Sequence, residues 1–186
     1  MSSNKIIKLM KEKEIEYVDL RFTDPKGKLQ HVTMDATVVD DEMLNEGIFF
    51  DGSSIAGWKA INESDMILKP DLERQVVDPF ASHNTLILFC DVLDAVKKDP
   101  YERDPRSTAK KAEAYLKKSG IGDKAFFGPE AEFFVFDDVK FKNDMNDTGF
   151  KIDSSEGPYN TGKNYENGNM GHRPGIKGGY FPVPPV

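Results

Sequence analysis

The sequence predicts an α+β protein, and three observations support this fold class. In the first hundred residues, strand-like runs of alternating apolar residues stand beside two short segments with helical spacing. A polar stretch that contains Pro100 then interrupts the pattern. Beyond it, a further helical segment leads into an aromatic run that is typical of a strand. The 186 residues are enough for one large domain or two small ones.

The elements of the first part follow in a clear order. Residues 3–13 have the spacing of an amphipathic helix. Residues 16–34 predict a β-hairpin, because the Asp-Pro-Lys-Gly sequence at 24–27 has the proline and glycine of a tight turn. Residues 38–46 predict a short helix that ends at Gly47.

Two further strands complete the first part. Residues 66–71 predict a strand that is ended by Pro70, and residues 85–93 predict a strongly apolar strand. Cys90, the only cysteine, lies in this second run, and we interpret it as a small buried hydrophobic residue. Asp51 and Gly52 indicate a tight turn, in which the aspartate could simply bond to its own backbone.

The polar stretch divides the predicted domains. We place the first domain at residues 1–97, a linker at 98–104 and a second domain at 105–186. Asp104 and Pro105 are typical of a helix start. This helix should run to Ser119, with four residues facing inward: Ala109, Ala112, Tyr115 and Leu116. Residues 143–179, which are rich in glycine, asparagine and proline, predict a long loop.

Residues 128–137 are predicted to form a strand that carries two carboxylates. Because strand side chains alternate between faces, Glu130 and Glu132 share one face with two phenylalanines. Burying two like charges this close together requires a partner that neutralises them. Oxygen ligands favour a hard dication, Mg²⁺ or Mn²⁺. The alternative, that the glutamates line the wet face of an amphipathic strand, stays open.

Composition excludes several function classes. The net charge of −7 argues against nucleic acid as a partner, because phosphate contacts need clustered lysine and arginine. It also argues against an anionic membrane surface. No apolar run is long enough to cross a bilayer, and the N-terminus lacks the apolar core of a secretory signal. We therefore expect a cytoplasmic protein.

Three groups of segments together carry a family resemblance. They are FDGSSIAGW at 50–58 with NESDM at 62–66, GPEAEFF at 128–134, and GHRP at 171–174 with KGGYFPVPP at 177–185. In this order and spacing they resemble the N-terminal part of bacterial type I glutamine synthetase, along essentially the whole chain. The resemblance implies a β-grasp N-terminal domain followed by the first, incomplete part of the catalytic domain.

The resemblance also implies an activity and a set of ligands. The family joins ammonia to L-glutamate to give L-glutamine, using ATP and a γ-glutamyl phosphate, with two Mg²⁺ or Mn²⁺ ions in each site. Glu130 and Glu132 match metal ligands. Asp51 matches the residue that binds ammonium and takes its proton, and Ser54 matches a residue that supports this pocket. No role is assigned to residues 177–180.

Two further expectations concern the oligomeric state of the protein and the activity of this chain alone. The resemblance implies a homo-oligomer, a dodecamer of two stacked hexameric rings, in which Asp51 serves the site of a neighbouring subunit. It covers less than half of a complete enzyme, so we expect the chain alone to be inactive. Two alternatives stay open: a non-catalytic module that joins or regulates such a ring, and a fragment of a γ-glutamyl-polyamine synthetase.

Overall fold

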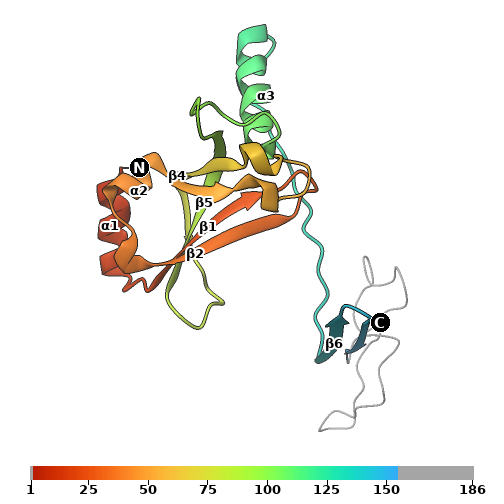
Figure 1. Ribbon diagram of the computed structural model, residues 1–186. Coiled ribbons are helices and arrows are strands. Elements are labelled where there is room, and N and C mark those ends of the chain that lie inside the picture. Colours follow the sequence, from red (N-terminus) through yellow and green to blue (C-terminus); the bar gives the residue numbers. More distant parts are fainter. Residues whose placement is uncertain (1, 155–186) are drawn as a thin grey trace, which may run out of the picture. The chain divides into compact units, whose positions relative to one another are not determined.

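The structure of the protein is a computed structural model that describes residues 2–154 (Figure 1). The chain divides into two compact units between Phe126 and Phe127. The first unit mixes one sheet with helices, which confirms the predicted α+β class. No helix within the described residues is both long and apolar enough to cross a bilayer.

The first unit is built on a five-stranded mixed sheet with the spatial order β2-β1-β5-β4-β3. β1 runs parallel to β5, whereas every other neighbouring pair is antiparallel. The strands are β1 (Tyr17–Thr23), β2 (Leu29–Asp35), β3 (Ile48–Asp51), β4 (Asp65–Val77) and β5 (Thr85–Asp94). The helices are α1 (Ser3–Glu12), α2 (Asp41–Glu46) and α3 (Pro105–Ser119), and the 3₁₀ turns are η1 (Ala36–Val38), η2 (Gly52–Ser54) and η3 (Ile61–Glu63).

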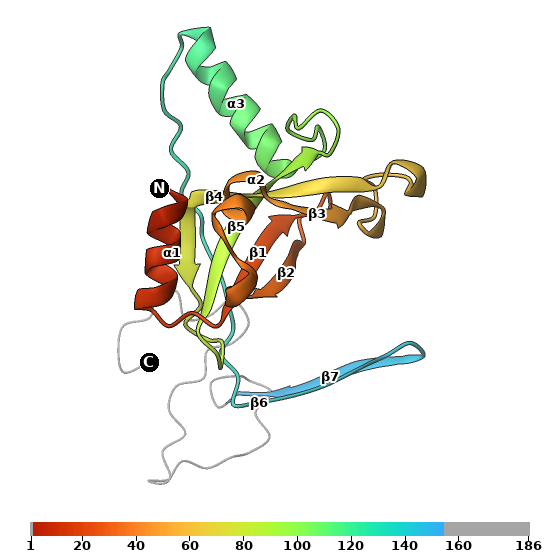
Figure 2. The same ribbon diagram turned by 60° about the vertical axis from the view of Figure 1, so that its left-hand side comes forward.

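The core lies between one face of this sheet and the helices α1 and α2 (Figure 2). Alternate residues of β1 and β5, such as Leu20 and Leu88, point into it and are fully buried. Ile6 from α1 and Leu44 from α2 are also fully buried in the same cluster. Burying side chains of this size stabilises the fold by about 1.5–3 kcal/mol each. The first unit therefore has a hydrophobic core of its own.

The predicted hairpin and its turn are confirmed. β1 and β2 pair antiparallel, from Tyr17 opposite Asp35 to Thr23 opposite Leu29. Gly27 closes the turn with φ of 84°, a backbone conformation that glycine adopts without strain. Its amide donates to the carbonyl oxygen of Asp24 at 3.0 Å.

Two element boundaries differ from the prediction by more than one residue. α2 begins at Asp41 rather than at residue 38, because the Asp40 carboxylate caps it by accepting from the Met43 amide at 2.8 Å. β4 does not end at Pro70 but continues to Val77. Its pairing with β5 shifts register between Pro70 and Gln75, so an irregularity accommodates the proline, which cannot donate to the ladder.

The start and end of α3 are as predicted, but its apolar face is not buried. Asp104 caps the helix by accepting from the amides of Arg106 and Ser107, and Gly120 ends it in the left-handed conformation. Ala109, Ala112 and Tyr115 are nevertheless exposed, and Leu116 is only half-buried. Figure 2 shows α3 projecting from the sheet, so within residues 2–126 little covers that face.

In the second unit, the predicted strand at residues 128–137 is not formed. The described residues of this unit contain two strands, β6 (Asp138–Asp144) and β7 (Asp147–Asp153), which form an antiparallel hairpin. This hairpin also corrects the predicted loop at 143–179, for its first eleven residues. A strand needs a neighbour to pair its backbone groups, and no strand of the described chain pairs with residues 128–136. Residues 155–186 lie outside the described part.

Candidate functional site

Asp51 stands at the end of β3, where the chain turns sharply away from the sheet. β3 pairs with β4 so that Asp51 lies opposite Asp65. Gly52 follows with its amide bonded to the carbonyl oxygen of Ser64 at 2.7 Å. A Cβ atom at Gly52 would come within 2.2 Å of the Met66 sulfur, so any larger residue would force the fully buried Met66 side chain to move. The tight turn therefore fixes the backbone position from which the Asp51 side chain extends.

The Asp51 carboxylate is held by the two serines that follow it. Its Oδ1 accepts from the amide of Ser53 at 2.8 Å and from the Ser53 hydroxyl at 2.6 Å. Its Oδ2 accepts from the Ser54 hydroxyl at 3.0 Å. These hydrogen bonds, first those from Ser53, lower the pKa of Asp51 below its ordinary value. The side chain is exposed, so the site presents a fixed anion to solvent.

The Asp51 carboxylate is better suited to binding a small cation than to acting as a strong base. A carboxylate attracts ammonium by charge and by accepting its N–H bonds. A lowered pKa weakens its basicity, so proton removal would have to be driven by the chemistry that follows. The simple turn interpretation also fits part of the geometry, since the Ser53 amide does bond to Asp51.

A cluster of aromatic side chains packs together near this turn. Trp58 is buried at 5% exposure, and its ring centroid lies 5.9 Å from that of Phe50 and 5.8 Å from that of Tyr101. Phe22 of β1 completes the cluster, 5.6 Å from Trp58. The indole N–H of Trp58 is buried without a hydrogen-bond partner in the described structure. The cluster joins the segment that begins at Asp51 to the main core.

Tyr101 and Arg103, which were not predicted as functional residues, hold this segment from outside it. Tyr101 is buried and donates its hydroxyl to the carbonyl oxygen of Trp58, and Arg103 donates to that of Gly57. Both residues lie in the stretch predicted to be a linker. The sequence offers only an aromatic residue three positions before the helix cap Asp104, and it does not show which carbonyl group that residue reaches.

Glu130 and Glu132 are not arranged as predicted. Both side chains are exposed, and neither residue belongs to a strand, so the burial that would demand a neutralising cation is absent. The structure brings Asp51 and Ser54 together, whereas the two glutamates belong to the other compact unit. Among residues 2–154, no three histidine, cysteine, aspartate or glutamate side chains gather where they could hold a metal ion. By themselves, the described residues therefore do not form a metal site.

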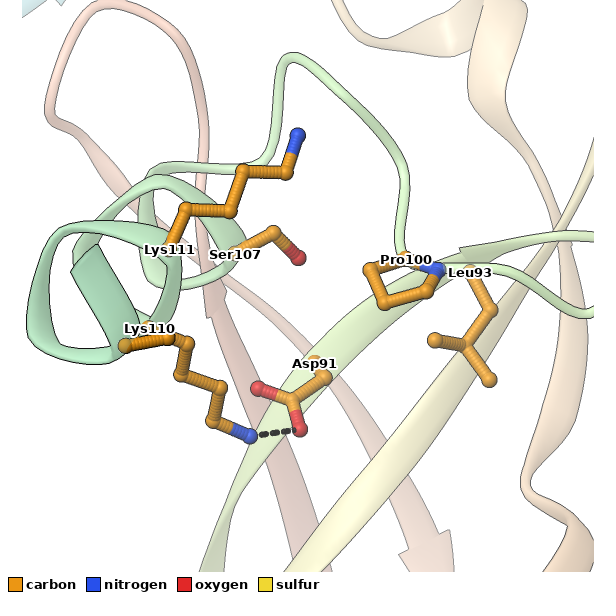
Figure 3. Close-up of a pocket in the computed structure, with 7 residues that line it drawn as sticks. Asp91, Leu93, Pro100, Ser107, Lys110 and Lys111 are labelled. Atoms are coloured by element: carbon orange, nitrogen blue, oxygen red, sulfur yellow. Dashed lines mark hydrogen bonds and ion pairs between the residues drawn. The ribbon is translucent and has the colours of Figure 1, made fainter. Parts of the chain in front are cut away.

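A separate pocket of about 250 Å³ lies between α3 and β5 (Figure 3). It contains none of the predicted site residues. Lys110 makes an ion pair with Asp91 at its edge. Asp91 also binds the guanidinium of Arg106 at 3.0 Å, so its charge is already neutralised. The pocket is lined by Asp91, Leu93, Pro100, Ser107, Lys110, Lys111 and Ala114.

Both parts of the chain match models of one protein family. Residues 14–95 match "Glutamine synthetase, beta-Grasp domain", and residues 102–186 match "Glutamine synthetase, catalytic domain". The first match ends at residue 95 and the second begins at residue 102, just before Asp104, which caps α3. The predicted motif at 171–185 falls within the second match but outside the described residues.

Individual relatives agree with these matches. The chain is 65% identical to a glutamine synthetase of Rhizobium meliloti and 60% identical to one of Azorhizobium caulinodans. Each match covers 100% of this chain but 39% of the relative, so the chain spans less than half of their length. A solved Plasmodium falciparum glutamine synthetase, 22% identical, matches with a TM-score of 0.70 over 98% of this chain and 36% of its own. That likeness concerns the fold.

Proposed function

The chain belongs to the glutamine synthetase family, and we propose that it is part of an enzyme that joins ammonia to L-glutamate. The reaction would consume ATP and pass through a γ-glutamyl phosphate. The observation that carries the proposal is the 65% identity that extends along the whole chain to a relative of this name. Because the chain spans 39% of that relative, the activity is proposed for the complete protein.

We propose that Asp51 binds ammonium and receives its proton, with Ser54 holding the carboxylate. The hydrogen bond from Ser54 at 3.0 Å and the exposed, anionic character of Asp51 support these roles. Ammonium is not a nucleophile until it loses a proton, and a carboxylate both attracts the cation and can accept that proton. The Ser53 amide at 2.8 Å and the Ser53 hydroxyl at 2.6 Å give the carboxylate two further donors.

Glu130 and Glu132 are proposed as metal ligands of the complete enzyme. Two carboxylates would leave a divalent ion mostly water-coordinated, so the remaining ligands must come from elsewhere in the enzyme. In phosphoryl transfer such ions neutralise charge on the phosphate groups of ATP. Since the described residues do not complete a metal site, we derive no step of the reaction through it.

Domain boundaries and assembly belong to the same proposal. The family matches to 14–95 and 102–186 support domains at 1–97 and 105–186, joined by residues 98–104. We propose that the complete protein assembles as two stacked hexameric rings and that Asp51 serves the site of a neighbouring subunit. Activity would then depend on assembly, because each site needs residues from two subunits.

The test compares Asp51→Asn with Asp65→Asn in the complete enzyme. Asp65 is the matched control, since it is an exposed aspartate directly opposite Asp51 in the β3–β4 ladder. We expect the rate of glutamine formation to fall by about 10²-fold or more in Asp51→Asn, the range that a proton-transfer group contributes. Asp65→Asn should stay close to wild type. Equal activity of the two variants would refute the role of Asp51.

The 186-residue chain itself provides a second arm of this test. We expect it to produce no glutamine and no γ-glutamyl transfer, because its described residues hold no complete metal site. Measurable synthesis by the purified chain would contradict the proposal that further ligands are required.

A further inference from the structure

Three side chains from one segment hold the loop that follows Asp51. Arg103 Nη1 donates to the carbonyl oxygen of Gly57 at 2.7 Å, and the Tyr101 hydroxyl donates to that of Trp58 at 3.0 Å. Lys59 Nζ donates to Asp94 Oδ2 at 2.9 Å. We call residues 51–64 the Asp51 loop, and Asp94, Tyr101 and Arg103 the clamp. The clamp grips three consecutive residues of the loop.

The clamp is hydrogen-bonded to regular secondary structure of the first unit. The amide of Tyr101 donates to the carbonyl oxygen of Val92 in β5 at 2.9 Å. Asp104, which is fully buried, caps α3 and also accepts from the Val92 amide at 3.4 Å. The ring of Tyr101 packs edge-on against Trp58, with 72° between the ring planes. Movement of the clamp would therefore disturb β5 and the start of α3.

The loop itself has little regular structure to keep its shape. Its internal backbone bonds are single turns, such as Ile55 to Gly52 at 3.2 Å and Trp58 to Ile55 at 3.2 Å. The carbonyl group of Trp58 receives its bond from the Tyr101 hydroxyl in a buried position. Removing that donor would leave a buried acceptor unsatisfied, which favours a rearranged loop.

We propose that Tyr101 and Arg103 are positioning residues for the Asp51 loop, which they hold in the shape that presents the Asp51 carboxylate. This inference rests on the proposed role of Asp51. Neither side chain needs to touch the substrate, since both act through the loop backbone. Because the catalytic-domain match begins at residue 102, the clamp also ties the loop to the first helix of the second matched region of the same chain.

Trp58 makes the proposal testable without activity. It is the only tryptophan, and it sits on the gripped part of the loop, so its fluorescence reports this loop alone. In the 186-residue chain, Tyr101→Phe keeps the ring and removes only the hydroxyl. Loss of about one net hydrogen bond should raise the population of open loop about five- to tenfold. Acrylamide should then quench Trp58 more strongly. Tyr115→Phe, at an exposed tyrosine, is the matched control.

Arg103→Ala provides an independent variant that does not touch the core, since Arg103 is exposed. Its control is Arg74→Ala, at another exposed arginine of the first unit. We expect stronger quenching in Arg103→Ala and none in its control, with unchanged far-UV circular dichroism in both. Wild-type quenching in both Tyr101→Phe and Arg103→Ala would overturn the proposal.

Kinetics of the complete enzyme separate the clamp from the role of Asp51. For Tyr101→Phe we expect KM for ammonium to rise severalfold while KM for glutamate stays unchanged, a split that general destabilisation would not produce. An active Asp51→Asn enzyme with a loosened Tyr101→Phe loop would refute the catalytic proposal and leave the clamp standing. An inactive Asp51→Asn enzyme with an unaltered Tyr101→Phe enzyme would refute the clamp.

Discussion

The two compact units of this chain contrast in what they do with apolar side chains. In the first unit, the apolar residues of β1 and β5 are buried, and Leu20 and Leu88 have no exposed surface. In the second unit, Phe134 is 83% exposed and Phe141 is 80% exposed. Apolar residues alternate along the chain in both units, and this alternation predicts which side chains share a face. It does not predict whether another part of the protein covers that face.

The difference lies in pairing partners. β1 has a strand on both sides, β2 and β5, and the helices α1 and α2 close the core face. β6 and β7 pair only with each other among the described residues, and a lone two-stranded hairpin is marginally stable at best in water. Phe141 and Phe150 are opposite each other in this hairpin and both stay exposed. Local pattern is therefore necessary but not sufficient for a stable strand.

Hydrogen exchange should show this contrast at its largest. We expect amides in the middle of β5 to exchange only through global unfolding, with protection of about 10³ or more. Amides of residues 130–135, which belong to no strand, should show protection below about tenfold. Exchange of the 186-residue chain, read by mass spectrometry of its peptides, measures both in one sample.

The hairpin β6–β7 serves as the internal control for that measurement. Its ladder bonds should give protection between the two extremes, because it opens more easily than the sheet of the first unit. Protection of residues 130–135 equal to that of β5 would show that this segment finds a strand partner in solution. The contrast between the units would then be wrong.

Much of the first unit could be predicted from local chemistry. The turn at Gly27, the end of α2 at Gly47 and the cap of α3 at Asp104 each depend on neighbouring residues alone. The buried face of β1 follows from alternation, since Val18 and Leu20 share one face of the strand and both are fully buried. In the site, the closeness of Ser54 to Asp51 could be predicted because both belong to one short turn.

What could not be predicted depends on distant partners. β4 continues beyond Pro70 because it pairs with β5, and a shift in register between Pro70 and Gln75 accommodates the proline. The exposed face of α3 and the unformed strand around Glu132 depend on surfaces that a local pattern does not describe. The bond from Tyr101 to Trp58 joins residues 43 positions apart in the sequence, and no local signal indicates it.

Truncating one apolar side chain in each unit should give very different losses of stability. Leu88→Ala removes a fully buried side chain of β5, and we expect a loss of about 2–5 kcal/mol in the free energy of unfolding. Phe134→Ala removes a larger side chain that is already exposed, and its effect should stay within about 0.5 kcal/mol. Urea titrations of the 186-residue chain, followed by far-UV circular dichroism, measure both.

Comparable losses in these two variants would mean that Phe134 is buried in solution. A small loss in Leu88→Ala alone would mean that the core tolerates the cavity by collapsing around it. Trp58 lies in the first unit, so its fluorescence should give the same urea midpoints for that unit as far-UV circular dichroism.

A smaller effect than that of Leu88→Ala is expected from the acid sensitivity that Asp94 gives to the first unit. Its carboxylate accepts from the amides of Lys97 and Val96 and from Lys59 Nζ, and these bonds lower its pKa from 3.8 to about 2. A folded-state pKa below the unfolded one adds stability above pH 4, and that stability is lost as the pH falls toward 2. Since a quarter of the side chain is exposed, the contribution should stay below about 1 kcal/mol.

Asp94→Asn isolates this contribution. Between about pH 5 and pH 2.5, the free energy of unfolding of the first unit should fall less steeply in Asp94→Asn than in the wild type. Asp65→Asn, at an exposed aspartate of the same unit, should keep the wild-type slope. After correction for the intrinsic effect of pH, hydrogen exchange of the β6–β7 amides should be the same in Asp94→Asn and in the wild type. These amides belong to the other unit. A wild-type slope in Asp94→Asn would show that Lys59 and the two amides do not stabilise the charged carboxylate. The bond between Lys59 and Asp94 could then no longer be counted among the three contacts that hold the Asp51 loop.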